Sequence, residues 1–190
     1  MQDLLELGAD TSVRPSSETG STVLFATSNG MEEAAELVEM AVNLVESEEG
    51  VNHGIKVVLK CHPLLPFFQI NSIVGVQLPS HVEQSEQPVT DLIRNSSIMV
   101  YSGSTVCIQA LVLGVPMIHL RPSFDFDLDP LETTPNARLE ASSLEEMREQ
   151  VSWLLENRDS YIAQHRDEWS ALAKEMYGPV TKETVNAFLP

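Results

Sequence analysis

The chain has 190 residues, of which 43% are hydrophobic and 21% are charged, a composition typical of one globular domain with a sizeable core. Its 28 acidic residues outnumber 11 Lys and Arg, and the resulting net charge of −17 argues against nucleic-acid binding. No stretch approaches the roughly 20 apolar residues that span a bilayer, and no secretory signal opens the chain. These features predict a cytoplasmic protein with no transmembrane segment, the inner face of the membrane being an alternative location.

Three regions are expected from the distribution of turn-forming residues. Residues 1–21 predict a short helix and a linker rich in Ser, Thr, Gly and Pro. Residues 22–178 predict a Rossmann-like domain, and residues 179–190 a C-terminal tail or short helix. A chain that opens on a linker leads us to expect that another domain normally precedes this one.

The first half of the domain combines short apolar runs with helical periodicity. The predicted strands are 22–26, 55–59 and, more weakly, 73–76. Between the first two strands, an amphipathic helix is expected to end near Gly50. Asn29 and Glu32 have the spacing of a capping box at its start.

The second half repeats the alternation of strands and helices. It predicts a helix over 91–95, a strand over 98–101, a helix over 105–113 that Gly114 ends, and a strand over 116–120. A long loop over 121–140 is then followed by helices that begin at Ser143 and near Ser160, with a last short helix over 182–188. Such alternation indicates an α/β domain in which helices cover both faces of a parallel sheet, a Rossmann-like three-layer sandwich.

Two motifs follow predicted strands 40 residues apart. The first is Lys60-Cys61-His62-Pro63, in which Pro63 restricts His62 to extended backbone and so holds the imidazole at the strand end. An imidazole there can donate to a phosphate oxygen, and Lys60 adds positive charge nearby. A His-Pro pair alone is common, and a strand-end histidine bonded to backbone is the alternative.

The second motif is Ser102-Gly103-Ser104-Thr105, between a strand and a helix. Successive backbone donors at a helix start, with hydroxyls around a glycine, favour an anion site. An ordinary helix cap is the alternative, although a cap needs only one hydroxyl. Asn29 and Gly30 belong to a third strand-to-helix turn. None of these turns contains a Walker motif or G-x-G-x-x-G, which disfavours ATP hydrolysis of that type and NAD binding.

Other chemically suggestive residues favour no metal or thiol site. Asp125, Asp127 and Asp129 alternate with apolar residues in the long loop, but they lack the glycine and closing glutamate of an EF-hand. Cys61 and Cys107 are expected to be small buried hydrophobic residues rather than nucleophiles. We therefore predict no metal site and leave open the role of the acidic loop.

The two motifs together resemble the C-terminal half of GT-B glycosyltransferases. Lys-x-His-Pro after one strand, Ser-Gly-Ser-Thr after another, and then Ala-Leu-Val-Leu-Gly-Val-Pro are similar to the HP and Ser-Ser/Thr motifs of several bacterial families. These are the sialyltransferases, polysialyltransferases, capsule-polysaccharide transferases and CDP-glycerol glycerophosphotransferases. The resemblance covers roughly residues 23–120 and implies one half of a GT-B fold.

The resemblance implies a nucleotide-sugar donor, CMP-linked or related, as substrate and no separate cofactor. It assigns His62 to the donor phosphate, as a hydrogen-bond donor or as the acid that assists nucleotide departure. Ser102, Gly103, Ser104 and Thr105 would hold the phosphate or the nucleoside. The acceptor site and catalytic base would come from an N-terminal Rossmann domain that this chain lacks, so we expect binding without turnover. The alternatives are a nucleotide-sugar epimerase half and a non-catalytic binding or interaction domain.

Overall fold

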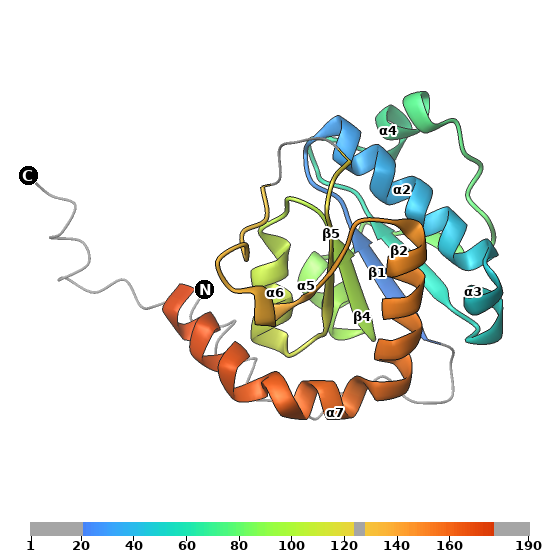
Figure 1. Cartoon of the computed structure of the whole chain (residues 1–190). Coiled ribbons are helices and arrows are strands. Elements are labelled where there is room, and N and C mark those ends of the chain that lie inside the picture. Colours follow the sequence, from blue (N-terminus) through green and yellow to red (C-terminus); the bar gives the residue numbers. More distant parts are fainter. Residues whose placement is uncertain (1–20, 124–127, 177–190) are drawn as a thin grey trace, which may run out of the picture.

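Six parallel strands form one sheet in the order β3-β2-β1-β4-β5-β6 (Figure 1). A computed structural model describes residues 21–123 and 128–176. The strands are β1 (Thr22–Ala26), β2 (Lys56–Lys60), β3 (Val82–Gln84), β4 (Ile98–Tyr101), β5 (Met117–Leu120) and β6 (Leu139–Ala141). The helices are α2 (Met31–Glu46), α3 (Glu48–Asn52), α4 (Phe67–Val74), α5 (Val89–Arg94), α6 (Val106–Leu113), the 3-10 turn η1 (Pro135–Ala137) and α7 (Leu144–Met176).

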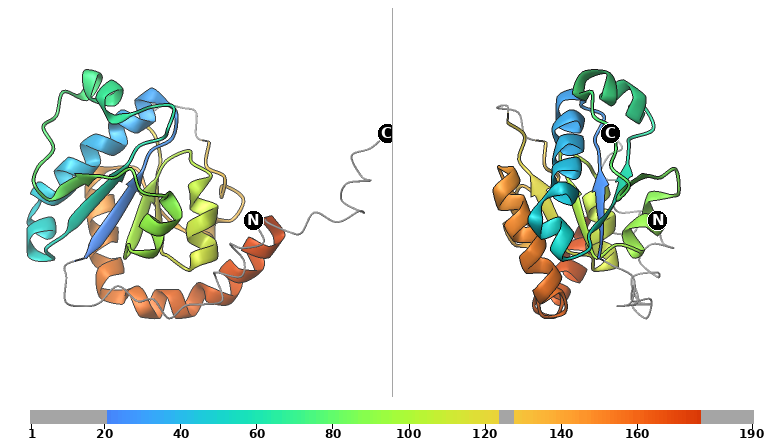
Figure 2. Two further views of the ribbon diagram at one scale, coloured as in Figure 1. Left: turned by 180° about the vertical axis from the view of Figure 1, so that it is seen from behind. Right: turned by 90° about the vertical axis from the view of Figure 1, so that its right-hand side faces the viewer.

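Helices cover both faces of this sheet, which confirms the predicted Rossmann-like three-layer fold. Figure 2 shows α2 and α3 on one face, with part of α7, and α5 and α6 on the other. The central strands β1 and β4 are apolar and almost entirely buried because both of their faces are covered. No helix in the described ranges is long and apolar enough to cross a membrane.

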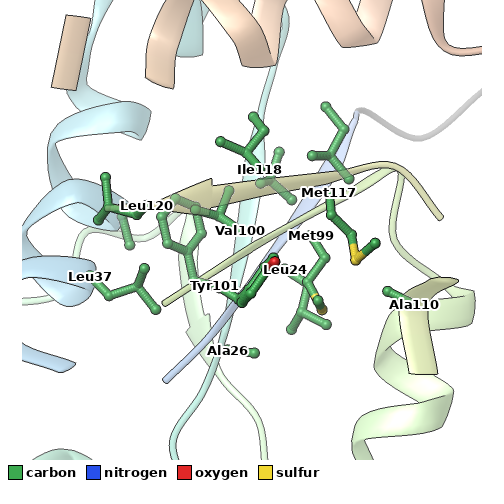
Figure 3. Close-up of a cluster of buried hydrophobic side chains, with 14 of the residues drawn as sticks. Leu24, Ala26, Leu37, Met99, Val100, Tyr101, Ala110, Met117, Ile118 and Leu120 are labelled. Carbon is green, nitrogen blue, oxygen red and sulfur yellow. The ribbon is translucent and has the colours of Figure 1, made fainter. Parts of the chain in front are cut away.

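The core is densest where β1, β4 and β5 lie side by side. Leu24, Met99 and Met117 have no exposed surface, and Figure 3 shows them with Leu37 of α2 and Ala110 of α6. Side chains on alternating strand positions point to opposite faces, so these strands supply both halves of the core. The core thereby holds the carboxyl ends of the central strands in a fixed order.

The expected strand over 73–76 is wrong, because these residues form the end of α4 and its cap. Gly75 adopts a left-handed conformation with φ 67°, and its N–H donates to the Asn71 carbonyl at 2.9 Å. A short apolar run cannot by itself distinguish a strand from a helix. The third strand is instead β3, an edge strand in which only Val82 is buried.

The C-terminal helices are also corrected. The two helices expected over 143–176 form one continuous helix, α7, which bends around the amino-terminal edge of the sheet (Figure 1). No glycine or proline interrupts the segment between them, and Arg158 Nε donates to the Ser97 carbonyl at 3.0 Å just before β4. At the start of α7, Glu146 N–H donates to Ser143 Oγ at 3.2 Å, while the Glu146 carboxylate accepts from Ser142, one residue earlier than a standard capping box.

The segment expected as one long loop, 121–140, contains the edge strand β6 and a buried ion cluster. Asp129 accepts hydrogen bonds from the Tyr101 hydroxyl at 2.9 Å and the Leu131 N–H at 3.0 Å, and it pairs with Arg138. Arg138 also lies 3.3 Å from Glu140 of β6. Burial raises the pKa of Tyr101 well above its ordinary value, so the hydroxyl remains a donor. Asp129 therefore anchors the segment after β5; Asp125 and Asp127 lie outside the described residues.

Replacing Asp129 by Ala tests this anchor. Within the described residues, the change leaves the buried Arg138 with Glu140 as its remaining ionic partner and removes the acceptor of Tyr101, so we expect a loss of about 3 kcal/mol in the free energy of unfolding. Urea denaturation followed by circular dichroism measures it. Asp159→Ala is the matched control, because its carboxylate is 82% exposed and its pair with Arg158 is long, at 3.6 Å. Equal stability of the two variants would contradict a structural role for Asp129.

Candidate functional site

The carboxyl ends of β2, β1 and β4 lie next to one another at one edge of the sheet. Ala26 at the end of β1 pairs with Lys60 of β2 on one side and with Tyr101 of β4 on the other. The strand order reverses between β1 and β4, which is the topological switch point where open α/β sheets bind ligands. The turns 27–30, 61–63 and 102–105, which follow these strands, are here called the switch-point site.

His62 is held in the turn after β2 by three hydrogen bonds. Its N–H donates to Thr27 Oγ1 at 3.0 Å, and its carbonyl accepts from the Leu65 N–H at 2.9 Å. Its ring Nδ1 accepts from the Leu64 N–H at 3.2 Å. A neutral imidazole that accepts at Nδ1 carries its proton on Nε2. The half-buried ring therefore keeps its Nε2–H as a donor.

Lys60 ends β2 with its side chain largely buried. Nζ lies 3.8 Å from Glu86, whose side chain is 86% exposed. An ion pair of that length with a solvated partner is weak. The charge of Glu86 nevertheless raises the pKa of Cys61 by more than Lys60 lowers it. Lys60 therefore supplies positive charge two residues before His62, and Glu86 offsets part of it.

The turn after β4 carries three hydroxyls, and none of them caps α6. The N-cap residue Thr105 makes no side-chain cap hydrogen bond, and Ser104 contributes only its carbonyl, which accepts from the Cys107 N–H at 3.2 Å. Ser102 is 2% exposed, and its Oγ has no hydrogen-bond partner in the described parts of the chain. Gly103 has φ 56°, a conformation that glycine adopts without strain. The helix-cap alternative thus has no side-chain bond to support it.

The turn after β1 lies between the other two. Thr27 N–H donates to the Lys60 carbonyl at 3.0 Å, which joins this turn to the end of β2. The expected capping box of Asn29 and Glu32 is wrong: Gly30 is the N-cap of α2, and Asn29 is exposed. Instead, Ser28 Oγ accepts from the Gly30 N–H at 3.1 Å and donates to Glu33. The carboxylate of Glu33, rather than that of Glu32, bends back over the turn.

Glu33 is the residue of this site that sequence reasoning missed. It is 7% exposed, and its carboxylate lies over the glycines of two turns. A Cβ on Gly103 would lie 2.8 Å from its Oε2, and a Cβ on Gly30 would lie 2.9 Å from the same oxygen. Both distances are shorter than real Cβ contacts, so glycine leaves room for the carboxylate at each turn. The spacing of Ser28, Gly30 and Glu33 could indicate a folded-back side chain, but only the β1–β4 pairing brings Gly103 close.

The three predicted turns therefore share one edge, but the two motifs are not immediate neighbours. β1 separates β2 from β4, and adjacent strands lie about 4.8 Å apart, so the motifs are about 10 Å apart across the sheet. A ligand that contacts both His62 and the turn at Gly103 must cross the turn after β1. A phosphate joined to a sugar or nucleoside has that extent.

Neither cysteine has the properties of a nucleophile. Burial, with a smaller contribution from Glu86, raises the pKa of Cys61 to about 11. Burial, with a smaller contribution from Asp129, raises the pKa of Cys107 to about 12. Within residues 21–123 and 128–176, no group of three or more His, Cys, Asp or Glu side chains could hold a metal ion.

Comparison with known proteins identifies the fold. No protein-family model matches the chain, and no curated protein has a significant sequence match. Among solved structures, the wall teichoic acid polymerase TagF (H444N variant) matches with a TM-score of 0.55 at 15% identity, covering 98% of this chain and 46% of TagF. The UDP-GlcNAc 2-epimerase of Methanocaldococcus jannaschii, in complex with UDP-GlcNAc and UDP, matches with a TM-score of 0.53 at 15% identity, covering 79% and 41%.

The calicheamicin glycosyltransferase CalG4 matches with a TM-score of 0.52 at 19% identity, covering 88% of this chain and 45% of CalG4. This chain therefore spans less than half the length of each of these proteins. Its fold is that of one half of a GT-B glycosyltransferase, a half that the epimerase shares. At these identities the similarity defines the fold and leaves the chemistry to the residues of the site.

Thiol alkylation tests the cysteine assignment. At pH 8 the folded chain should react with iodoacetamide roughly a hundredfold more slowly than an unfolded chain, because pKa values of about 11 and 12 leave very little thiolate. The raised pKa values favour the neutral thiols of the folded state. Burial of the neutral thiols therefore contributes to the free energy of unfolding below about pH 9, the ordinary pKa of a cysteine. This contribution is lost as the pH rises toward 11 and 12, because the unfolded chain loses its thiol protons first. Rapid alkylation of the folded chain at pH 8 would contradict this assignment and indicate a reactive thiol.

Proposed function

We propose that this chain is the donor-binding half of a GT-B glycosyltransferase in surface polysaccharide synthesis, with a nucleotide sugar, CMP-linked or related, as its ligand. The observation that carries the proposal is the meeting of three strand-to-helix turns at the switch point, one of which presents His62 Nε2 as a donor. Hydrogen-bond donors and a lysine at that position suit a phosphate group.

The proposed roles follow from the positions of the side chains. His62 would donate to the donor phosphate, or act as the acid that assists its departure as negative charge develops on the leaving nucleotide. Lys60 would add positive charge on the same side. Ser102, Gly103, Ser104 and Thr105 would hold the phosphate or nucleoside at the start of α6, and Asn29 and Gly30 would line the turn between.

A second Rossmann-like domain is part of the proposal. In this account it supplies the acceptor site and the catalytic base, as the resemblance to GT-B glycosyltransferases implies. We place the complete enzyme in the cytoplasm, with the inner face of the membrane as the alternative location. The proposal favours a function similar to that of the bacterial transferase families that the two motifs resemble, which include the capsule-polysaccharide transferases.

An epimerase half is the second candidate, favoured by the fold similarity to the UDP-GlcNAc 2-epimerase. A carboxylate-rich loop near the ligand phosphate would favour an epimerase, and the loop of Asp125, Asp127 and Asp129 is the candidate for it. Asp129 of that loop is buried in the ion pair with Arg138, and it cannot supply such a group. A non-catalytic binding or interaction domain is the remaining alternative, and the absence of nucleotide binding by the correctly folded chain would favour it.

Titration of CMP, CDP and UDP against wild-type protein and His62→Ala tests the ligand and the residue together. Loss of a hydrogen bond to a charged phosphate should weaken nucleotide binding by about tenfold or more, as measured by isothermal titration calorimetry. His81→Ala is the matched control, because His81 is exposed and its carbonyl accepts from Val57 N–H at the opposite edge of the sheet. Binding that His62→Ala leaves undiminished would remove His62 from the site.

The isolated chain should bind without catalysing transfer. Incubation of this 190-residue chain with CMP-, CDP- and UDP-linked sugars and a polysaccharide acceptor should give no product above background, because the proposal assigns the base and the acceptor site to a second domain. Product analysis by mass spectrometry is the measurement. Transfer by the chain alone would show that its own residues complete the active site.

A further inference from the structure

The charge balance of the switch-point site is unusual for a site that would hold a phosphate. Segments 26–33, 60–63 and 101–105 contain one lysine and one histidine against two glutamates. Glu32 is exposed, but Glu33 is buried, with its carboxylate over the turn that leads into α6. An anion at the start of α6 would therefore lie next to a fixed carboxylate.

The carboxylate of Glu33 is held in this position. The Ser28 hydroxyl donates to Oε2, and the Gly30 N–H in turn donates to Ser28 at 3.1 Å. Gly30 and Gly103 both lack the Cβ that would displace it. Stabilisation of the start of α2 does not require burial, since Glu32 places the same charge in the same first turn from an exposed position. Stabilisation of α2 therefore does not explain why Glu33 is buried between two turns of the site.

The neighbouring residue leaves a hydrogen-bonding group unused at this turn. Ser102, adjacent to Gly103, is 2% exposed, and its hydroxyl has no partner in the described parts of the chain. An unpaired buried hydroxyl costs free energy unless a ligand pairs with it. The turn therefore offers an unused hydrogen-bonding group beside a carboxylate.

We propose that Glu33 is a specificity-determining residue that disfavours diphosphates and favours ligands with a single phosphate group. Repulsion by a fixed carboxylate grows with the negative charge of the ligand, and it is stronger in a partly buried site than in water. Lys60 and His62 compensate one phosphate on the β2 side, and Glu33 opposes a second on the β4 side. This inference rests on the proposed function, because it concerns the same site.

The test compares matched ligands that differ by one phosphate. CMP with CDP, and inorganic phosphate with pyrophosphate, are titrated against wild-type protein, Glu33→Gln and Glu32→Gln by calorimetry. Glu33→Gln should improve binding of the diphosphate of each pair by about threefold to tenfold more than binding of the monophosphate. Glu32→Gln changes the net charge and the first turn of α2 identically, and it should leave the monophosphate-to-diphosphate ratio unchanged.

The outcomes separate this inference from the proposed function. Nucleotide binding with an unchanged ratio in Glu33→Gln, or the same change of ratio in Glu32→Gln, would overturn the role of Glu33 alone. Discrimination between phosphate and pyrophosphate without binding of CMP or CDP would overturn the nucleotide-sugar proposal and support the role of Glu33. If no anion binds to wild-type protein or to either variant, both proposals fail. Should Glu33→Gln not fold by circular dichroism, Glu33→Asp, which withdraws the carboxylate by one methylene, should shift the ratio in the same direction.

Discussion

The parallel pairing of β1 with β2 on one side and β4 on the other determines where this molecule can bind a ligand. Ala26 pairs with both Lys60 and Tyr101, so the chain segments that follow these three residues leave the sheet side by side. The strands are buried on both faces, and a shift of register by one residue would reverse the direction of every side chain on them. The positions of His62, Ser28 and Gly103 are therefore consequences of the core.

Close approach of the turns explains the residues that occupy them. The turn after β1 is bonded to β2 through the Thr27 N–H and to His62 through Thr27 Oγ1, while the Glu33 side chain reaches over Gly103 on the other side. A buried carboxylate between two turns has a desolvation cost that the Ser28 hydroxyl and the start of α2 offset in part. A buried carboxylate has a larger desolvation cost than an exposed one in the same helical turn. This cost is consistent with the proposed role of Glu33 in selecting a ligand by its charge.

The buried elements could be predicted from sequence, and the edges could not. β1, β4 and β5 are mostly apolar and mostly buried, and Gly114 marks the end of α6 with φ 67°, as expected. β3 and β6 have three residues each and mix polar with apolar positions, because an edge strand is covered on fewer sides. The absence of glycine and proline from α7 was visible in the sequence, but the tertiary bond from Arg158 to Ser97 in the middle of this helix was not.

The site shows the same division between local and tertiary information. His62-Pro63 and the hydroxyl-rich turn at Gly103 follow buried strands, so their place at the carboxyl edge could be inferred from the sequence alone. The sequence could not show which nitrogen of the His62 ring donates, because this depends on the hydrogen bond from the Leu64 N–H to Nδ1. The sequence could not show the position of Glu33 either. That position depends on Gly103, which lies 70 residues away and which the β1–β4 pairing brings near.

The net charge of −17 does not describe the charge at the switch-point site. Charges distant from the site are screened within about 10 Å at moderate ionic strength, so the global excess has little influence on a ligand at the switch point. What acts there is the local set of Lys60, its partner Glu86, His62 and Glu33. One lysine and one histidine hydrogen-bond donor provide little positive charge for a diphosphate, and the buried carboxylate of Glu33 makes the deficit larger. The local balance, rather than the overall charge, is what the proposed phosphate-containing ligand must satisfy.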